Sequence, residues 1–201
     1  RLGQIARRNR TNRSYIGLGY HDTITPSVIL RMVMENPGWY TPYTPYQAEI
    51  AQGRLESLLN FQTMVTDLTG MDVANASLLD EATAGAEAMT LLHRVRPASR
   101  AARNVFLASD RCLPHVLEQL RSRAEPLGIE LRIGPVDGAP LDNVFGVMLA
   151  YPDESGLVED LGPIIKKAHD AGALVAVDAD LLSLALLTDR KSTRLNSSHV
   201  S

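Results

Sequence analysis

Two stretches of this 201-residue chain carry side chains that could take part in chemistry. The first, residues 39–47 (WYTPYTPYQ), places several phenol rings on a segment stiffened by proline, which fixes φ and pushes each preceding residue toward extended geometry. The rings of Tyr43 and Tyr46 could wall a pocket, and their hydroxyls could orient a small polar substrate. The same rings could simply cover the edge of a core, and the composition of the stretch alone favours that simpler interpretation.

The second stretch, residues 75–87 (NASLLDEATAGAE), has small residues and hydroxyls where a helix is predicted to start. Such a start lets backbone N–H groups approach an anion closely. Asp80 and Glu81 bring negative charge to the place that a phosphate would take, so capping of the helix by Asp80 is the simpler interpretation. Asp178 and Asp180 follow a predicted strand, at the edge where α/β proteins often bind ligands.

Other common site patterns are missing from the sequence. The five histidines are scattered without the spacing of metal ligands, which predicts no metal site. Neither a G-x-S-x-G elbow nor a phosphate-binding P-loop occurs. The single cysteine, Cys112, cannot form an internal disulfide, has no evident activating partner, and is expected to be a small buried hydrophobic residue.

The composition is that of a folded globular protein, with 45% hydrophobic and 21% charged residues. A net charge of −3 does not suggest a nucleic-acid-binding or membrane-surface protein. No apolar run reaches the roughly 18 residues that span a bilayer. Five arginines within residues 1–13 could bind a polyanion or could belong to a terminus that docks elsewhere.

Hydrophobic periodicity predicts the elements that position these residues. In the first half we expect helices at residues 26–35, 47–69 and 81–93, the second of them stopped by Gly70. In the second half, strands are predicted at 105–108, 131–133, 144–151 and 173–177, and helices at 113–127 and 163–171. Alternation of apolar strands with helices favours a parallel sheet with right-handed crossovers. The sequence therefore predicts an α/β fold with an α-rich N-terminal portion.

Four motifs together resemble the glycine decarboxylase family, the P-proteins of the glycine cleavage system. They are SYIGLGY at residues 14–20, ENPGWYTPYTPYQ at 35–47, QGRLESLLN at 52–60 and ANASLLDEAT at 74–83. The likeness extends over roughly residues 9–187, and long motifs that agree in order are far more specific than one short motif. It identifies the chain with the N-terminal half of this family, or with subunit 1 of its two-chain members.

The resemblance implies the large domain of an aspartate-aminotransferase-like (fold type I) enzyme that depends on pyridoxal phosphate (PLP). The domain would be incomplete here, with an α-rich part at residues 1–95 and a βαβ part at 104–187. The implied activity is that of glycine dehydrogenase (decarboxylating), in which PLP acts as an electron sink and the aminomethyl group passes to the lipoyl arm of the H protein. Glycine, lipoylated H protein and the C-terminal half or subunit 2 would be the partners, in a bacterial cytoplasm or a mitochondrial matrix.

In this family the lysine that anchors PLP lies in the other half, within a His-Lys motif. The lysines here, Lys166, Lys167 and Lys191, lie in no such motif. No catalytic residue is therefore assigned to this chain, and PLP is expected to be bound mainly by the partner half.

The resemblance also implies a set of residues that line the active-site funnel. These are Tyr43 and Tyr46 at the entrance for glycine or the lipoyl arm, with Asn75, Ser77 and Thr83 near a degenerate phosphate loop. Asp178 stands where cofactor-binding relatives place the carboxylate that pairs with the pyridine nitrogen of PLP. The family's N-terminal half matches better at Asp180, which makes Asp178 the weaker assignment.

Residues 188–201 are polar and resemble nothing in the family, so we expect a disordered tail or an artefact of the sequence. Two other functions stay open. One is a non-catalytic structural or interaction subunit of the same complex, and the other is a different fold-type-I PLP enzyme such as an aminotransferase. The aminotransferase would leave the stretch at residues 39–47 unexplained.

Overall fold

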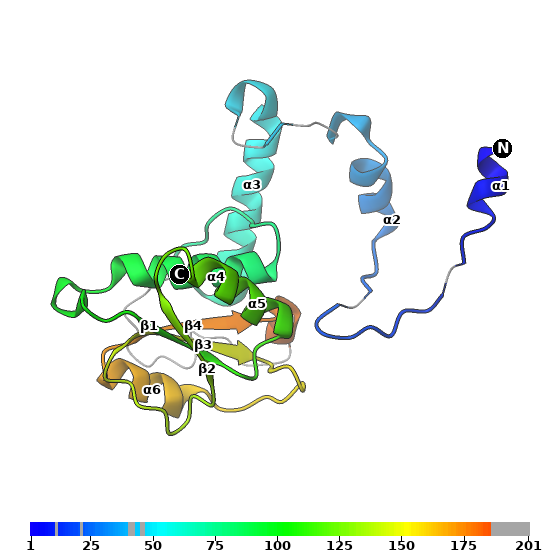
Figure 1. Ribbon diagram of the computed structural model, residues 1–201. Coiled ribbons are helices and arrows are strands. Elements are labelled where there is room, and N and C mark those ends of the chain that lie inside the picture. Colours follow the sequence, from blue (N-terminus) through cyan, green and yellow to red (C-terminus); the bar gives the residue numbers. More distant parts are fainter. Residues whose placement is uncertain (11, 21, 40–42, 45–46, 186–201) are drawn as a thin grey trace. The chain divides into compact units, whose positions relative to one another are not determined.

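The structure is a computed structural model that describes every residue except 11, 21, 40–42, 45–46 and 186–201, and of residue 48 only the backbone. The chain divides into two compact units, residues 1–40 and 41–201 (Figure 1). None of the helices in the described ranges combines the length and the apolar composition that a bilayer-spanning helix needs. The polar tail predicted at residues 188–201 lies outside the described residues.

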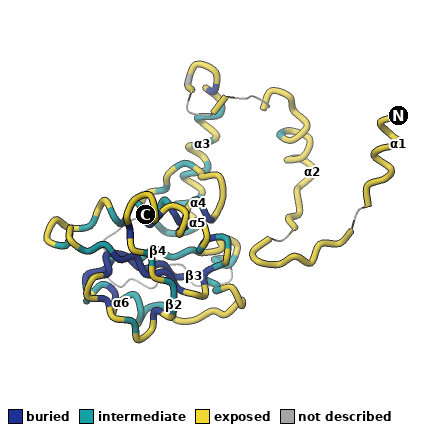
Figure 2. The backbone as a smooth tube through the Cα atoms, viewed as in Figure 1, coloured by how far each residue is buried: buried dark blue, intermediate teal, exposed yellow. Residues whose placement is uncertain are grey.

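The first unit consists of short helical segments whose side chains are almost all exposed (Figure 2). Its elements are α1 (Leu2–Ala6), α2 (Ser27–Ile29), the π-helical turn η1 (Leu30–Met34) and the 3-10 turn η2 (Pro37–Trp39). The helix predicted at residues 26–35 is present, but its second half is wider than an α-helix. The N–H of Glu35 donates to the carbonyl of Leu30 at 2.9 Å, a bond five residues back.

The second unit begins with the long helix α3 (Ala48–Thr69), which confirms the predicted span. It ends because Gly70 adopts a left-handed conformation with φ of 65°, where its N–H donates to the carbonyl of Thr66. The backbone departs from helical geometry at Ala51, which is buried. Most other side chains of α3 are exposed, and the helix rises away from the sheet (Figures 1 and 2).

A four-stranded parallel sheet forms the centre of the second unit, in the order β2-β1-β3-β4. The strands are β1 (Val105–Ser109), β2 (Glu130–Gly134), β3 (Val144–Tyr151) and β4 (Leu174–Ala179). The helices around it are α4 (Glu81–Val95), α5 (Pro114–Ala124) and α6 (Gly162–Asp170), and two 3-10 turns, η3 (Ala98–Arg100) and η4 (Leu181–Ala185), complete the unit. The predicted α/β fold with parallel strands is thus confirmed.

The sheet separates two hydrophobic clusters, because its strands are apolar on both faces (Figures 1 and 2). On one face, Phe106 and Phe145 pack against residues of α4 and α5. On the other, Val105 and Val147 pack against α6. The connection from α4 leads into the amino end of β1, and α5 starts just after the carboxyl end of that strand. The first turns of α4 and α5 therefore lie at the carboxyl end of the sheet.

Candidate functional site

The start of α4 is closed by one of its own side chains. Asp80 Oδ1 accepts a hydrogen bond from the backbone N–H of Thr83 at 2.7 Å, which confirms the predicted cap. This backbone hydrogen bond is the main cause that holds the pKa of Asp80 below its ordinary value, and the Thr83 hydroxyl and His115 add to it. A carboxylate thus already occupies the position at which the helix dipole would favour a bound anion.

Glu81, the first residue of α4, pairs with a histidine from the neighbouring helix. Its Oε2 lies 3.1 Å from Nε2 of His115, the second residue of α5. Both side chains are partly exposed, so the pair joins the first turns of α4 and α5 at the rim of the sheet.

Asp178 lies near the carboxyl end of β4, and its Oδ2 is buried without a hydrogen-bond partner. The pKa of Asp178 is raised to about 7, first by burial and then by the charge of Glu81 and a hydrogen bond between the two carboxyl groups. A carboxyl group in such surroundings holds its proton near neutral pH. By contrast, Asp180 is exposed, and its Oδ1 accepts from the N–H of Leu182 in the turn that follows β4.

Cys112 is completely buried behind this edge. Burial raises the pKa of its thiol to about 12, and the negative charge of Asp178 contributes next. A thiol with that pKa stays protonated at physiological pH and is a poor nucleophile. The prediction that Cys112 is a small buried hydrophobic residue is confirmed.

Arg111 ties together the loops that follow β1 and β3. Its Nη1 lies 2.7 Å from Oε2 of Glu159 and 3.7 Å from Oδ2 of Asp153, while its backbone carbonyl accepts from the N–H of Glu154 at 2.9 Å. Hydrogen bonding and charge from Glu159 raise the pKa of the guanidinium. The two loops are therefore held as one rim beside Asp178.

The funnel residues predicted from the resemblance fall in two places. Asn75 and Ser77 are exposed, and Thr83 is half-buried at the start of α4, so these three lie on one segment. That segment is anchored to α3, because Gln62 Nε2 donates to the carbonyl of residue 74 at 2.6 Å. Tyr43, which is partly exposed, instead lies in the segment before the amino end of α3.

Of the phenol stretch, Tyr43 is described and comes before the amino end of α3, whereas residues 75–83 follow the carboxyl end of that helix. Helix α3 has 22 residues and is about 33 Å long. Tyr46 lies outside the described residues.

The described residues do not fit a PLP molecule resident in this chain. Lys166 and Lys167, the described lysines, belong to α6 on the face of the sheet opposite α4 and α5. Lys166 Nζ also pairs with Oδ2 of Asp170 at 2.5 Å. The helix start that could hold a phosphate is closed by Asp80. In the part of the chain that the structure describes, no lysine therefore lies at the carboxyl end of the sheet, and the anion position at the start of α4 is taken by Asp80.

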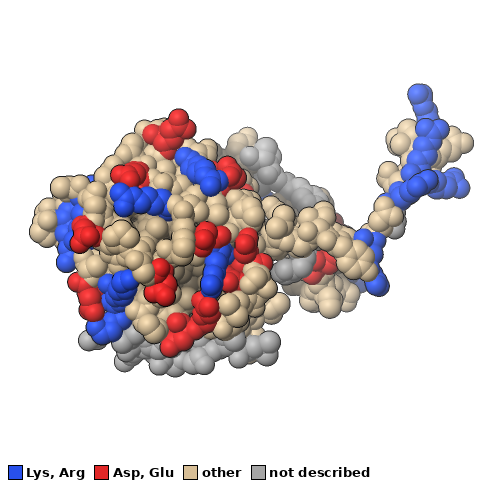
Figure 3. All heavy atoms as spheres, turned by 60° about the horizontal axis from the view of Figure 1, so that its bottom comes forward, with Lys and Arg blue, Asp and Glu red and all other residues tan. Residues whose placement is uncertain are grey.

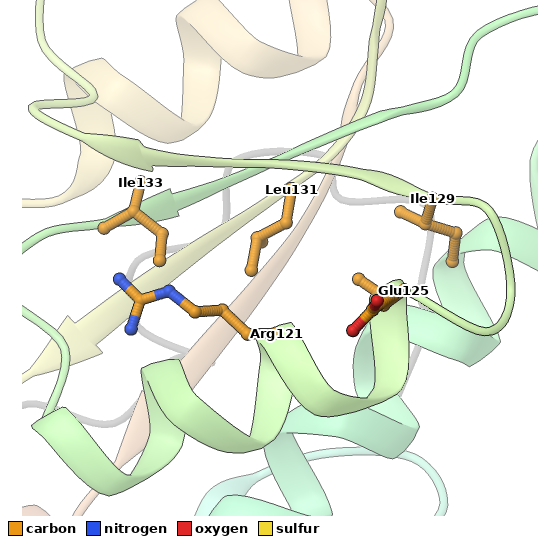
Figure 4. A pocket seen from close by; sticks show the side chains of 6 residues that line it. Arg121, Glu125, Ile129, Leu131 and Ile133 are labelled. Atoms are coloured by element: carbon orange, nitrogen blue, oxygen red, sulfur yellow. The ribbon is translucent and has the colours of Figure 1, made fainter.

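An open groove of about 480 Å³ lies elsewhere, between α5 and β2 at the edge of the sheet. Figure 4 shows Leu131 and Ile133 pointing toward α5, with Arg121 and Glu125 on the helix opposite them. The remaining lining residues are Ala124 and Ile129. Arg121 forms an ion pair with Glu118, which does not line the groove.

Sequence reasoning missed the association of Glu81, His115 and Asp178. It treated Glu81 as negative charge at a helix start and considered the histidines only as metal ligands. A signal was present, because each residue stands at a helix start or strand end, and a parallel α/β topology brings those points to one edge. Within the described ranges, no three His, Cys, Asp or Glu side chains are grouped so that they could hold a metal ion.

Comparisons with known proteins agree on one family. The family model of the glycine cleavage system P-protein matches residues 1–193. Over 189 residues, the chain is 56% identical to a glycine dehydrogenase (decarboxylating) from Nostoc sp., which covers 94% of this chain and 19% of the Nostoc protein.

A solved structure is similar as well. The crystal structure of a glycine decarboxylase (P-protein) of the glycine cleavage system, in inhibitor-bound form, matches with a TM-score of 0.79 and 33% identity. The match covers 95% of this chain and 44% of that chain. The chain thus spans about a fifth of the curated relative and less than half of the solved one.

Proposed function

Since this chain belongs to the glycine cleavage system P-protein family, we propose that it forms part of a glycine dehydrogenase (decarboxylating). The reaction would release CO2 from glycine and transfer the aminomethyl group to the lipoyl arm of an H protein. Both relatives carry the name of the enzyme, which favours this function over a purely structural subunit and over an aminotransferase.

Within that enzyme, the chain would act as the half that does not anchor the cofactor. The observation that carries this proposal is the carboxylate cap of Asp80 at the start of α4, where a phosphate would otherwise sit. The positions of Lys166 and Lys167 on the opposite face of the sheet support the same division of labour. PLP would then be bound by a lysine of the C-terminal half or subunit 2, and its chemistry would take place there.

The contribution of this chain would be to shape the entrance and to orient what enters it. Tyr43, Asn75 and Ser77 are partly or largely exposed, so their polar groups are accessible to a partner or a substrate. Together with Tyr46 and Thr83 they would line a funnel that is completed by the other half. The hydroxyl and amide groups of the funnel would position glycine and exclude water from its reacting end.

The cofactor assignment can be tested on the complete P-protein that contains this sequence. Borohydride reduction fixes PLP to its lysine, and peptide mass spectrometry then locates the pyridoxyl group. We expect the label outside residues 1–201. A label on Lys166 or Lys167 would refute the proposed division of labour, even in an enzyme with full glycine–CO2 exchange.

A further inference from the structure

Three ionisable side chains from three separate elements meet at the carboxyl end of the sheet. Asp178 comes from β4, Glu81 from the first turn of α4 and His115 from the first turn of α5. Glu81 is the middle member. Its Oε2 lies 3.1 Å from Nε2 of His115, α4 packs against β4, and Glu81 contributes to the raised pKa of Asp178 through its charge and a hydrogen bond. The Oδ2 atom of Asp178 is buried and without a hydrogen-bond partner.

Most charged side chains around Asp178, Glu81 and His115 are acidic. Asp80 precedes Glu81 at the start of α4. The negative charges of Asp178 and Glu81 raise the pKa of Cys112, as do those of Asp110 and Glu154 in the loops after β1 and β3. The nearby cation Arg111 forms ion pairs with Glu159 and Asp153. Apart from His115, therefore, no cation of the described residues is paired with the two carboxyl groups.

Two adjacent carboxyl groups, one of them buried, are costly to ionise together. With one proton between them, Asp178 can donate to Glu81, and Glu81 can accept from His115 on its other side. Without that proton, the charges on β4 and α4 repel each other, and a buried oxygen of Asp178 is left charged with no donor.

We propose that Asp178, Glu81 and His115 form a proton-dependent clasp that holds the start of α4 against the carboxyl end of β4. The clasp goes beyond the proposed function and does not depend on it. It fixes the position of residues 75–80 as well, because that segment leads directly into α4.

The direction of the pH dependence follows from the pKa of Asp178, which is raised from an ordinary 3.8 to about 7. The folded chain holds this proton more tightly than the unfolded chain does. The stabilisation is complete below the ordinary pKa, diminishes as the pH rises, and is lost once the pH passes about 7. In mildly acidic solution the clasp therefore holds the start of α4 against β4, and in mildly alkaline solution this contact is weakened.

Hydrogen–deuterium exchange of the complete P-protein tests the clasp without reference to activity. The readout is the exchange of amides 83–86, measured at pH 6 and pH 8 and corrected for the intrinsic pH dependence of exchange. In the wild type, corrected exchange should increase several-fold between the two conditions. In Asp178→Asn, whose amide can donate to Glu81 but cannot ionise, exchange should stay low at both.

Two further variants complete the design. Glu81→Gln replaces one of the two charges with an amide that can donate to an ionised Asp178, so corrected exchange should stay low at both pH values. This exposed position also serves if Asp178→Asn does not fold. Asp110→Asn removes a nearby carboxylate that does not contact Asp178, and its profile should match the wild type. Equal corrected exchange at both pH values in the wild type, or an unchanged profile in the Asp178 and Glu81 variants, would overturn the clasp.

Discussion

Asp80 Oδ1 accepts the backbone N–H of Thr83 at 2.7 Å, so the protein's own carboxylate fills the anion position at the start of α4. The N-terminal turn of a helix offers unpaired N–H groups and a positive dipole end, which suit a phosphate or a carboxylate equally. The Asp80 carboxylate belongs to the same chain and so stays close to this position, and the adjacent Glu81 adds further negative charge. A phosphate would therefore have to displace a covalently attached competitor.

Replacement of Asp80 tests this cap. Asp80→Ala should lower the urea midpoint of unfolding because the N–H of Thr83 loses its acceptor, whereas Asp80→Asn should unfold close to the wild type because asparagine caps equally well. The pKa of Asp80 is lowered in the folded chain, so the contribution exists above the ordinary pKa and disappears as the pH falls through the lowered value. Equal midpoints for the Ala and Asn variants at neutral pH would contradict the assigned role.

Gly146 in β3 allows the close approach of two core side chains. A Cβ at this position would lie 2.9 Å from Phe106 Cε2 and 3.2 Å from Leu92 Cδ1. Gly146→Ala should therefore destabilise the fold by about 1–3 kcal/mol through overpacking. Gly134→Ala in β2 is the matched control, since its Cβ would meet nothing within 4 Å. Chemical denaturation of both variants decides the point, and equal losses of stability would contradict it.

Cys112 should be unreactive in the folded protein. With a pKa of about 12, roughly one thiol in ten thousand is ionised at pH 8, and the side chain is also inaccessible. A thiol reagent added to the native chain should give no colour on the time scale of minutes and one equivalent after denaturation. Because this is the single cysteine of the sequence, prompt labelling of the native chain would show that the edge of the sheet opens.

Most of the fold could be predicted from the sequence, because its signals are local. The apolar strands, the stop at Gly70 and the cap at Asp80 each depend on neighbouring residues. The contacts among Glu81, His115 and Asp178 depend on which elements the sheet brings together, and no local pattern contains that information. The π-helical turn after Ile29 was missed for a similar reason, since its wide hydrogen bond leaves no mark in hydrophobic periodicity.

The ion pairs of Arg111 should order the loops after β1 and β3 but add little to the free energy of unfolding. These ion pairs are partly exposed, and such pairs contribute little to overall stability. Arg111→Ala should leave the unfolding midpoint nearly unchanged but increase hydrogen exchange across residues 153–159. Arg132→Ala, which breaks a pair with Glu130 inside one strand, should leave that segment protected. Similar exchange in both variants would show that Arg111 does not hold the two loops together.

Tyr43 provides a test of the funnel in the complete enzyme. If its hydroxyl orients glycine or the lipoyl arm, Tyr43→Phe should reduce kcat/KM by about three- to tenfold, the effect of one lost hydrogen bond, with assembly intact. Tyr15→Phe in the first unit removes the hydroxyl of a more exposed tyrosine and should have no effect. Steady-state kinetics combined with sizing of the complex separates the possible roles. Lost assembly with normal turnover of the complex that remains would instead indicate that Tyr43 serves in docking and takes no part in the reaction.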